Sequence, residues 1–402
     1  MNVFAAFSKS APGPASAGED APPVCFLGVS SVKLWGMTPA ERVLKVLRRH
    51  GIHRIISEDD LPGLHGTVIL VRADAVIDAP LASVLAADVG LVLIGDDLGH
   101  ERPVAAHVVA EHAVAAAQVL TEGGRLPVYL RIKARRPSEL GQNFRKSLRK
   151  REAPYALVVS RANLREVEWR MFMGTYKGAT DFITKFVWPV PAYHVTRWLA
   201  PTSVTPNLVT GVSAVFVVLA TVLFWYGLWL PGLIAAWMMT FLDTVDGKLA
   251  RVTLSSSRWG DVFDHGIDLV HPPFWYAAWA VGLMSQGGGL ADEWIWWSFA
   301  AIMAGYVVQR LMEGTAIKFL GLEIHIWRPI DYAFRHITAR RNPNLVLLTA
   351  GALAGQPGWA FVAVAVWTVV CLVLHAIQLA QAFVARHRRG LLVSWLDVAP
   401  DG

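Results

Sequence analysis

Five aspartates and no glutamate stand within residues 241–268, whose sequence is FLDTVDGKLARVTLSSSRWGDVFDHGID. Asp243 and Asp246 are three positions apart, so in a helix both carboxylates project from one side. After a polar turn, Asp264 and Asp268 stand four positions apart and share a face of the next helix. Two adjacent helices are therefore predicted to bring four carboxylates together.

Carboxylates gathered in this way repel one another and are costly near hydrocarbon, so a shared cation is expected. The divalent cations Mg²⁺ and Mn²⁺ prefer carboxylate oxygen, and two of them about 3.5–4 Å apart form a site for displacement at phosphorus. Gly247, Ala250 and Gly260 leave almost no side-chain bulk beside the aspartates. A bulky phosphorylated ligand can therefore approach the backbone there.

A simpler explanation is that the aspartates cap helices and pair with basic residues of the same stretch, which are Lys248, Arg251 and Arg258. This explanation is sufficient for any one aspartate. It does not account for all four together with the small residues at fixed intervals, so the metal hypothesis is preferred.

The composition indicates where these helices lie. The chain has 402 residues, of which 54% are hydrophobic and 17 are tryptophan, and its mean hydropathy is +0.40. Such a chain is too apolar for a soluble enzyme. Apolar runs of near-spanning length occur at 206–229, 232–252, 260–284, 294–317, 343–356 and 358–385. They predict six transmembrane helices, of which the fifth is short for a straight crossing.

Lys and Arg favour the cytoplasmic side of a membrane. Here they concentrate in the second and fourth links and after the last run, at Lys248, Arg251, Arg258, Lys318, Arg328, Arg335, Arg340, Arg341, Arg386, Arg388 and Arg389. The first, third and fifth links have none. The sequence therefore predicts a multi-pass protein of the inner (cytoplasmic) membrane, with both termini and the aspartates on the cytoplasmic side.

The aspartate-rich stretch resembles the signature of the CDP-alcohol phosphotransferase family, DxxDGxxARx8GxxxDxxxD. Its eight defined positions are matched by Asp243, Asp246, Gly247, Ala250, Arg251, Gly260, Asp264 and Asp268. The resemblance extends over roughly 180–385 and implies a six-helix membrane fold. It also implies an enzyme of phospholipid or polar-lipid synthesis, which transfers a substituted phosphate group from a CDP-linked donor to an alcohol and releases CMP.

By this resemblance, two divalent cations, Mg²⁺ or Mn²⁺, are held by Asp243, Asp246 and Asp264. Asp268 is the catalytic base and can also be a metal ligand. The cytidine diphosphate site is formed by Gly247, Ala250, Arg251 and Gly260. The expected partners are a CDP-alcohol donor, an acceptor alcohol that is a lipid or resembles inositol phosphate, membrane lipids, and a second copy of the chain in a homodimer. No nucleic-acid partner is expected.

The start of the first span is a further candidate for ligand binding. Thr205 and Asn207 flank Pro206 there, and an asparagine amide can donate to a phosphate. The alternative is a plain helix cap, although the pattern TPNxxT is also similar to the family. Before this point, residues 181–200 mix aromatic and basic residues and predict an interfacial helix on the membrane surface.

The fourth link carries four arginines that can bind an acceptor phosphate or a lipid phosphate in a bidentate manner. They are Arg328, Arg335, Arg340 and Arg341. The preferred alternative is ordinary positive-inside topology with contact to anionic lipid. His265, next to Asp264, either assists proton movement, contacts the donor phosphate or is merely structural.

Residues 23–180 predict a cytoplasmic α/β domain. A short apolar run leads into a helix over 39–50, a strand near 52–56, and further strands at TVILVRADAVI and VGLVLIG with helices between them. This alternation is typical of a doubly wound, Rossmann-like sheet. The order resembles a nucleotidyltransferase, with Asp74 placed as the metal-binding aspartate. The loop GVSSVKLWG lacks the closely spaced glycines that let backbone N–H groups surround a phosphate, so a degenerate domain is preferred.

The remaining segments complete the predicted organisation. Residues 1–22 are expected to be a disordered lead without a secretory core, residues 201–390 the membrane domain and residues 391–402 a cytoplasmic tail. Cys25 and Cys371 fall in different parts of the chain, so no disulfide is expected.

Two similarities disagree about the substrate. The region that joins the two halves resembles bifunctional proteins that make CDP-inositol and condense it with inositol phosphate. By contrast, DGKLAR and FDHGID resemble the choline and ethanolamine phosphotransferases. Two alternatives to the leading hypothesis therefore stay open. One is a bifunctional enzyme whose N-terminal domain is also a cytidylyltransferase, and the other is a catalytically silent membrane scaffold.

Overall fold

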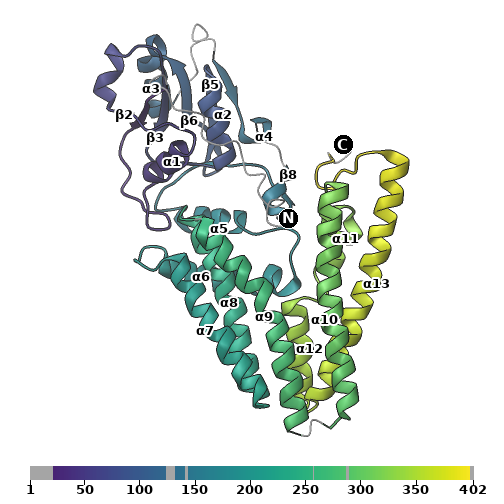
Figure 1. Cartoon of the computed structure of the whole chain (residues 1–402). Coiled ribbons are helices and arrows are strands. Elements are labelled where there is room, and N and C mark those ends of the chain that lie inside the picture. The colour runs from purple at the N-terminus through teal and green to yellow at the C-terminus, as the bar shows by residue number, and fades with distance from the viewer. Residues whose placement is uncertain (1–20, 124–131, 141–143, 257, 287–288, 399–402) are drawn as a thin grey trace. The chain divides into compact units, whose positions relative to one another are not determined.

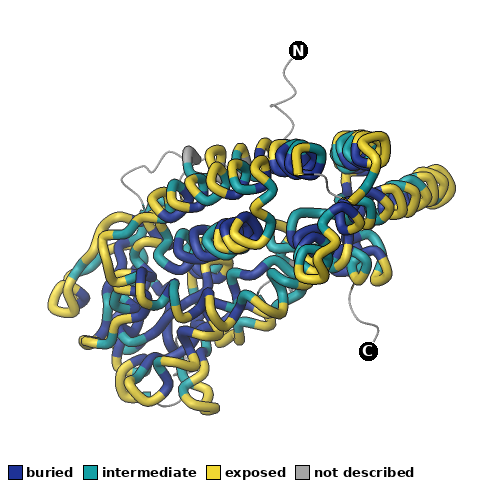
Figure 2. The backbone as a smooth tube through the Cα atoms, turned by 90° about the horizontal axis from the view of Figure 1, so that it is seen from below, coloured by how far each residue is buried: buried dark blue, intermediate teal, exposed yellow. Residues whose placement is uncertain are grey.

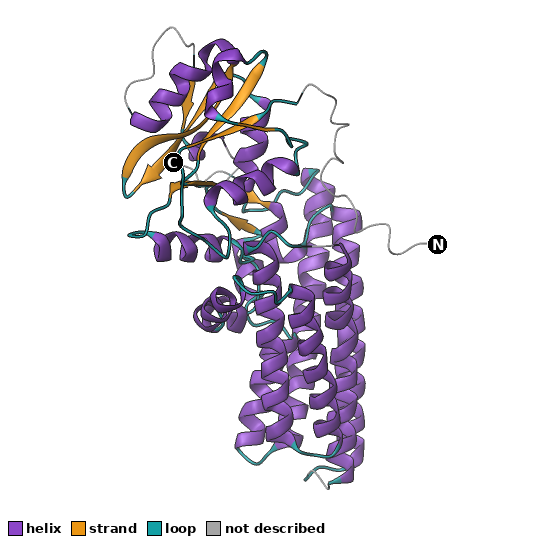
Figure 3. Ribbon diagram, turned by 90° about the vertical axis from the view of Figure 1, so that its left-hand side faces the viewer, coloured by secondary structure: helices purple, strands orange, loops and turns teal. Residues whose placement is uncertain are grey.

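The chain folds into two compact units in the computed structural model, which describes residues 21–123, 132–140, 144–256, 258–286 and 289–398. The first unit comprises residues 1–145 and 151–174, and the second comprises 146–150 and 175–402. Figure 3 shows the strands in the N-terminal part of the chain and long helices in the C-terminal part. The predicted order of an α/β domain followed by a helical domain is confirmed.

The first unit alternates short strands with helices. Its strands are β1 (Val24–Leu27), β2 (Ile55–Ile56), β3 (Thr67–Arg72), β4 (Ala75–Ile77), β5 (Leu91–Asp97), β6 (His100–Val109), β7 (Lys133–Arg135) and β10 (Ala156–Val158). Its helices are α1 (Pro39–Arg48), α2 (Ala79–Ala87), α3 (Ala113–Glu122), α4 (Pro137–Leu140) and α5 (Leu164–Gly174), with 3₁₀ turns η2 (Glu58–Gly63) and η3 (Ala110–His112). Strands β8 (Phe144–Arg145) and β9 (Lys150–Arg151) pair separately around the 3₁₀ turn η5 (Lys146–Leu148).

The sheet of the first unit is mixed, with the order β2-β1-β3-β6-β5-β10-β4 and β7 beside β5. Strand β1 is parallel to β2 and β3, whereas β6 is antiparallel to β3 and to β5. Helix α1 begins at the predicted residue, Pro39, and ends at Arg48, two residues before the predicted end. A capping box between Thr38 and Glu41 starts it. The buried faces of β1, β3 and β6 pack with α3 into one apolar core.

The second unit is helical in the part of it that is described. It contains η6 (Ile183–Val187), α6 (Pro189–Leu199), α7 (Pro206–Trp225), α8 (Trp229–Val252), α9 (Arg258–Ser285), α10 (Asp292–Thr315), η7 (Ala316–Leu320), η8 (Ile324–Ile326), α11 (Pro329–Phe334), α12 (Arg341–Leu353) and α13 (Pro357–Arg389). Each of the six predicted apolar runs corresponds to one helix, α7, α8, α9, α10, α12 or α13.

Two helices among the described residues are long and apolar enough to cross a membrane by length and composition alone. They are α7, with a mean hydropathy of 2.3, and α13, with a mean hydropathy of 2.5. The fifth run forms only the 13 residues of α12, as its length predicted. The predicted interfacial segment is divided into η6 and α6, and Pro189 is the first residue of the second helix.

Close helix packing builds the second unit. Helix α7 packs against α8 and α9, while α13 packs against α10 and α12 (Figure 1). Phe224, Trp279 and Phe361 are completely buried in the shared core. Figure 2 shows buried residues on the inward sides of these helices and exposed residues on their outward sides. The packing of these inward-facing side chains therefore fixes the positions of α7, α8, α9 and α12, the helices that carry the candidate site.

Candidate metal and phosphotransfer site

One arginine joins two of the predicted site aspartates. Arg341, the first residue of α12, donates from Nη2 to Oδ2 of Asp243 and from Nη1 to Oδ1 of Asp268, both at 2.5 Å. Asp243 lies on α8 and Asp268 on α9. The predicted convergence of the two acidic helices is thus confirmed for these two carboxylates. The positively charged guanidinium of Arg341 lies between them.

Asp246 is held from a fourth helix. Thr210 of α7 donates from Oγ1 to Oδ2 of Asp246 at 2.5 Å, and its hydroxyl also contacts the carbonyl of Pro206 at 3.1 Å. The other oxygen of Asp246, Oδ1, is buried and has no hydrogen-bond partner within the described part of the chain. A buried carboxylate oxygen without a partner is costly, so this atom is poised for a ligand.

Water access increases from one carboxylate to the next. Asp246 is 3% exposed, and the side chains of Asp243 and Asp268 are 16% and 43% exposed. The inner carboxylates therefore lie in a poorly hydrated wall, and Asp268 faces the solvent. Of the three carboxylates that the structure describes, Asp268 is the one that a soluble or interfacial substrate can approach most easily.

The basic residues next to the aspartates do not all pair with them. The Lys248 ammonium lies 3.5 Å from the centroid of the Tyr176 ring and 3.3 Å from the carbonyl oxygen of Thr175. Arg251 donates from Nη1 to the carbonyl of Gly247 at 3.1 Å, one turn back on its own helix. Arg341, which the simple capping explanation did not include, is a counter-ion of Asp243 and Asp268.

The remaining residues predicted for the site are Asp264, His265 and the small residues of the signature. The side chains of Asp264 and His265 lie outside the described residues, so their predicted roles stay predictions. The backbone of Gly247 is closely covered, because a Cβ there would stand 3.3 Å from Nη1 of Arg251. Ala250 follows on the same helix, and Gly260 stands in the first turn of α9.

The start of α7 is a helix cap. Thr205 is the N-cap residue, and its hydroxyl accepts a hydrogen bond from the backbone N–H of Leu208 at 3.2 Å. Asn207 is exposed. The residue of this segment that reaches the aspartates is Thr210, the final threonine of the TPNxxT pattern. That pattern was the sequence signal for it, although its role was not predicted.

Three arginines of the fourth link have partners other than the site aspartates. Arg328 pairs with Asp331 at 2.9 Å, and Arg340 pairs with Glu313. Arg335 is buried beside Thr338, and burial lowers its pKa to about 10. The predicted group of four is therefore divided, since Arg341 turns to the aspartates and these three do not.

The donor set fits a hard divalent cation. Within the described residues, no three acidic, histidine or cysteine side chains surround one point closely enough to hold a metal ion. Asp243, Asp246 and Asp268 nevertheless offer carboxylate oxygens, the ligands that Mg²⁺ and Mn²⁺ prefer. The buried, unpartnered Oδ1 of Asp246 and the arginine on the other two carboxylates both indicate a demand for positive charge.

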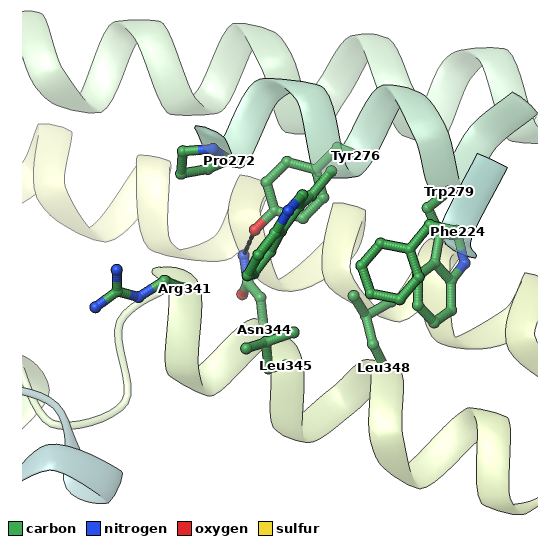
Figure 4. A pocket seen from close by; sticks show the side chains of 9 residues that line it. Phe224, Pro272, Tyr276, Trp279, Arg341, Asn344, Leu345 and Leu348 are labelled. Atoms are coloured by element: carbon green, nitrogen blue, oxygen red, sulfur yellow. Dashed lines mark hydrogen bonds between the residues drawn. The ribbon is translucent and has the colours of Figure 1, made fainter. Parts of the chain in front are cut away.

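A narrow aromatic hollow extends from this site between α7, α9 and α12. It is lined by Phe224, Pro272, Trp275, Tyr276, Trp279, Arg341, Asn344, Leu345 and Leu348. Figure 4 shows Arg341 at one end of the hollow, and the amide of Asn344 donating to the hydroxyl of Tyr276 at 2.7 Å. The hollow is thus lined mainly by apolar and aromatic side chains and has a charged residue at one end.

Asp74, the candidate metal aspartate of the α/β unit, has a cationic neighbour. Arg72 donates from Nε to Oδ1 of Asp74 at 2.9 Å and from Nη2 to Oδ2 at 2.6 Å.

Both cysteines are buried free thiols in separate units.

Comparison with known proteins identifies the helical part of the chain. Residues 203–337 match the family model of the CDP-alcohol phosphatidyltransferases. Cholinephosphotransferase 1 from Danio rerio is 38% identical over 92 residues, which cover 19% of this chain and 24% of that protein. The match therefore spans about a quarter of the length of this curated relative.

Two crystal structures of the phosphatidylinositol phosphate synthase of Mycobacterium tuberculosis are also similar. One has CDP-DAG bound, with a TM-score of 0.36, 16% identity, and coverage of 52% of this chain and 98% of that chain. The other contains manganese and citrate, with a TM-score of 0.35, 16% identity, and coverage of 52% and 93%.

The aspartate signature and the family match coincide in one segment. Residues 203–337 therefore contain a CDP-alcohol phosphatidyltransferase domain. The match does not include the α/β unit.

Proposed function

We propose that the protein is an integral-membrane CDP-alcohol phosphotransferase of phospholipid or polar-lipid synthesis. It would transfer a substituted phosphate group from a CDP-linked donor to an alcohol acceptor and release CMP. The observation that carries this proposal is the cluster of aspartate carboxylates on α8 and α9, within the segment that matches the family.

Asp243, Asp246 and Asp268, together with Asp264, are the residues proposed to hold divalent cations. Two such ions, when bound, would neutralise the donor diphosphate and stabilise the charge that develops on the leaving CMP. Thr210 fixes one oxygen of Asp246 and leaves the other free to bind. Gly247, Ala250, Arg251 and Gly260 are proposed to shape the cytidine diphosphate site beside them.

Asp268 is proposed to accept the proton of the acceptor hydroxyl. Its side chain is the most exposed of the three described site carboxylates, so a hydroxyl group can come within hydrogen-bond distance of it. The acceptor oxygen would then attack the phosphorus atom of the substituted phosphate group that is transferred, and the bond from this phosphorus to the bridging oxygen would break, so that CMP leaves with that oxygen.

The membrane position follows from the outward faces of the helices. Val215 of α7, Ile234 of α8, Trp297 of α10 and Val366 of α13 are between 58% and 74% exposed. Exposed apolar side chains on several helices are costly in water, and lipid would cover them. We propose six spans with cytoplasmic termini, η6 and α6 at the membrane surface, and a homodimer as the assembly.

We propose the α/β unit as a nucleotidyltransferase-like domain without catalytic activity. The loop after β1 has few closely spaced glycines, and Asp74 is engaged by Arg72. A bifunctional enzyme would have to release the Asp74 carboxylate from Arg72 before Asp74 could bind metal.

The test is a turnover assay on the full-length protein in nanodiscs. With Mg²⁺ or Mn²⁺, lipid acceptors, inositol phosphate and a panel of CDP-alcohols, we expect CMP release and a product of matching mass from at least one pair of substrates. Asp246→Asn should lower CMP release by at least about 100-fold, because the variant loses a charged ligand to the metal ions that stabilise the transition state.

Asp292→Asn is the matched control, since Asp292 stands in the exposed first turn of α10, and it should keep wild-type turnover. If the folded wild-type protein released CMP from no donor in the panel, the proposed function would be wrong and the scaffold alternative would be favoured.

A further inference from the structure

The guanidinium of Arg341 occupies the space between two carboxylates that the proposed function assigns to metal ions. Its two terminal nitrogens each contact a different aspartate, one on α8 and one on α9, at 2.5 Å. The Arg341 side chain is 18% exposed, so these contacts are partly shielded from water. Charge-assisted hydrogen bonds of this kind are among the strongest in proteins.

We propose that Arg341 is the built-in counter-ion of this carboxylate site, and that a divalent cation must displace its guanidinium from Asp243 and Asp268 in order to bind. The inference rests on the proposed function only in taking these aspartates as metal ligands. Beyond the proposed function, the inference is that Arg341, which lies outside the aspartate signature, determines how tightly the site binds metal.

Charge balance is the first reason. Asp243 and Asp268 share one guanidinium, and Asp246 stands one turn from Asp243 with an unpartnered oxygen. Carboxylates this close together cannot all remain ionised without nearby positive charge. Arg341 supplies one positive charge in the metal-free protein, whereas a divalent ion supplies two.

Competition is the second reason. A guanidinium within hydrogen-bond distance of both carboxylates would stand only a few ångströms from a cation bound to the same oxygens. Two like charges this close repel each other near a protein surface, and the double charge of a divalent ion increases this repulsion. Arg341 and the metal ion therefore exclude each other from this position.

Mobility is the third reason. Arg341 is the first residue of α12, preceded by the N-cap residue Arg340, so its side chain projects from a helix end. Nη1 also lies 3.7 Å from the sulfur of Met239, which is a weak contact. The long side chain can leave the aspartates by rotation about its own bonds while the helix stays in place.

The test measures metal binding rather than turnover. Metal-stripped, full-length protein in nanodiscs is titrated with Mn²⁺, and free Mn²⁺ is followed by its electron paramagnetic resonance signal. If the arginine-bound form makes up about nine-tenths of the metal-free protein, Arg341→Gln should bind Mn²⁺ about tenfold more tightly than wild type. Arg341→Lys should give a smaller gain, because a single ammonium group cannot bridge both carboxylates in the same way.

Arg328→Gln is the matched control. It removes another partly buried arginine that pairs with an aspartate, Asp331 at 2.9 Å, and should leave Mn²⁺ affinity unchanged. Equal or weaker Mn²⁺ binding by both Arg341 variants, with wild-type binding intact, would overturn this inference and leave the proposed function standing. A wild-type protein that bound no Mn²⁺ would overturn both.

Thermal unfolding gives a second measurement in case the glutamine variant is unstable without metal. Metal-free Arg341→Gln should unfold at a lower temperature than metal-free wild type, since its carboxylates lose their counter-ion. Saturating Mn²⁺ should close most of that gap. A variant whose melting temperature matched wild type without metal would contradict the role of Arg341 as counter-ion.

Discussion

At the scale of single residues, Thr210 shows how a side chain outside the signature controls one within it. Its hydroxyl is the donor to Oδ2 of Asp246, from a different helix. A hydrogen bond to a charged group contributes about 1.5–3 kcal/mol. Thr210 thereby sets which oxygen of Asp246 faces the site.

Replacing Thr210 with valine keeps the shape of the side chain and removes this donor. We expect Thr210→Val to lower kcat/KM for CMP release by roughly tenfold to a hundredfold, the range that the lost hydrogen bond corresponds to. Weaker binding of Mn²⁺ should accompany the loss, as measured by the same titration as for Arg341.

Thr221→Val is the comparison variant, because Thr221 also lies on α7 but bonds only the carbonyl of Val217 on its own helix. It should retain both activity and metal affinity. Equal effects of the two valine substitutions would show that Thr210 stabilises α7 in general and has no special effect on Asp246.

At the scale of helices, α10 and α13 approach each other closely at one glycine. A Cβ on Gly305 would stand 2.4 Å from Cγ2 of Thr368, far inside van der Waals contact. Thr368 is buried and its hydroxyl bonds the carbonyl of Val364. The absence of a side chain at position 305 therefore lets the two helices pack.

We predict that Gly305→Ala destabilises the second unit by about 1–3 kcal/mol, the usual effect of overpacking a core. The melting temperature of the protein in nanodiscs measures this loss. Gly314→Ala on the same helix should be neutral or stabilising by up to about 1 kcal/mol, since a Cβ there meets nothing within 4 Å and alanine favours helix.

The double variant Gly305→Ala, Thr368→Ser makes this prediction specific. Serine lacks the Cγ2 methyl group of threonine, so the added alanine should fit and part of the lost stability should return. If the serine substitution gave no recovery, the packing of Gly305 against Thr368 would not be the cause.

At the scale of the whole molecule, the fifth apolar run decides the topology. Helix α12 has 13 residues, which gives it a length of about 20 Å against a hydrocarbon thickness of about 30 Å. If α12 crosses together with neighbouring residues, three spans separate the start of α10 from the end of α13. If α12 does not cross, only two spans separate them.

Cysteine labelling distinguishes these arrangements. The natural thiols Cys25 and Cys371 are fully buried, so their background reaction with maleimide should be low. With six spans, Asp292→Cys should react with an impermeant maleimide from the outer side of sealed vesicles, and Leu391→Cys only from the cytoplasmic side. Labelling of both positions from the same side would show that α12 does not span.

Much of the fold followed from local patterns in the sequence. Spacings of three and four residues placed Asp243 with Asp246 and Asp264 with Asp268 on helix faces, because the helical repeat is a local property. The apolar runs likewise predicted the positions of α7, α8, α9, α10, α12 and α13, since burial in lipid or in a core requires continuous apolar surface. The family was evident from the same eight signature positions.

Only the tertiary structure decided which cation meets the aspartates. Arg341 is separated from Asp243 by 98 residues and from Asp268 by 73, and no local spacing relates them. Thr210 reaches Asp246 across 36 residues for the same reason. These contacts exist because the packing of α7, α8, α9 and α12 brings distant parts of the chain together. The spacing of residues within one helix does not determine which other helices pack against it.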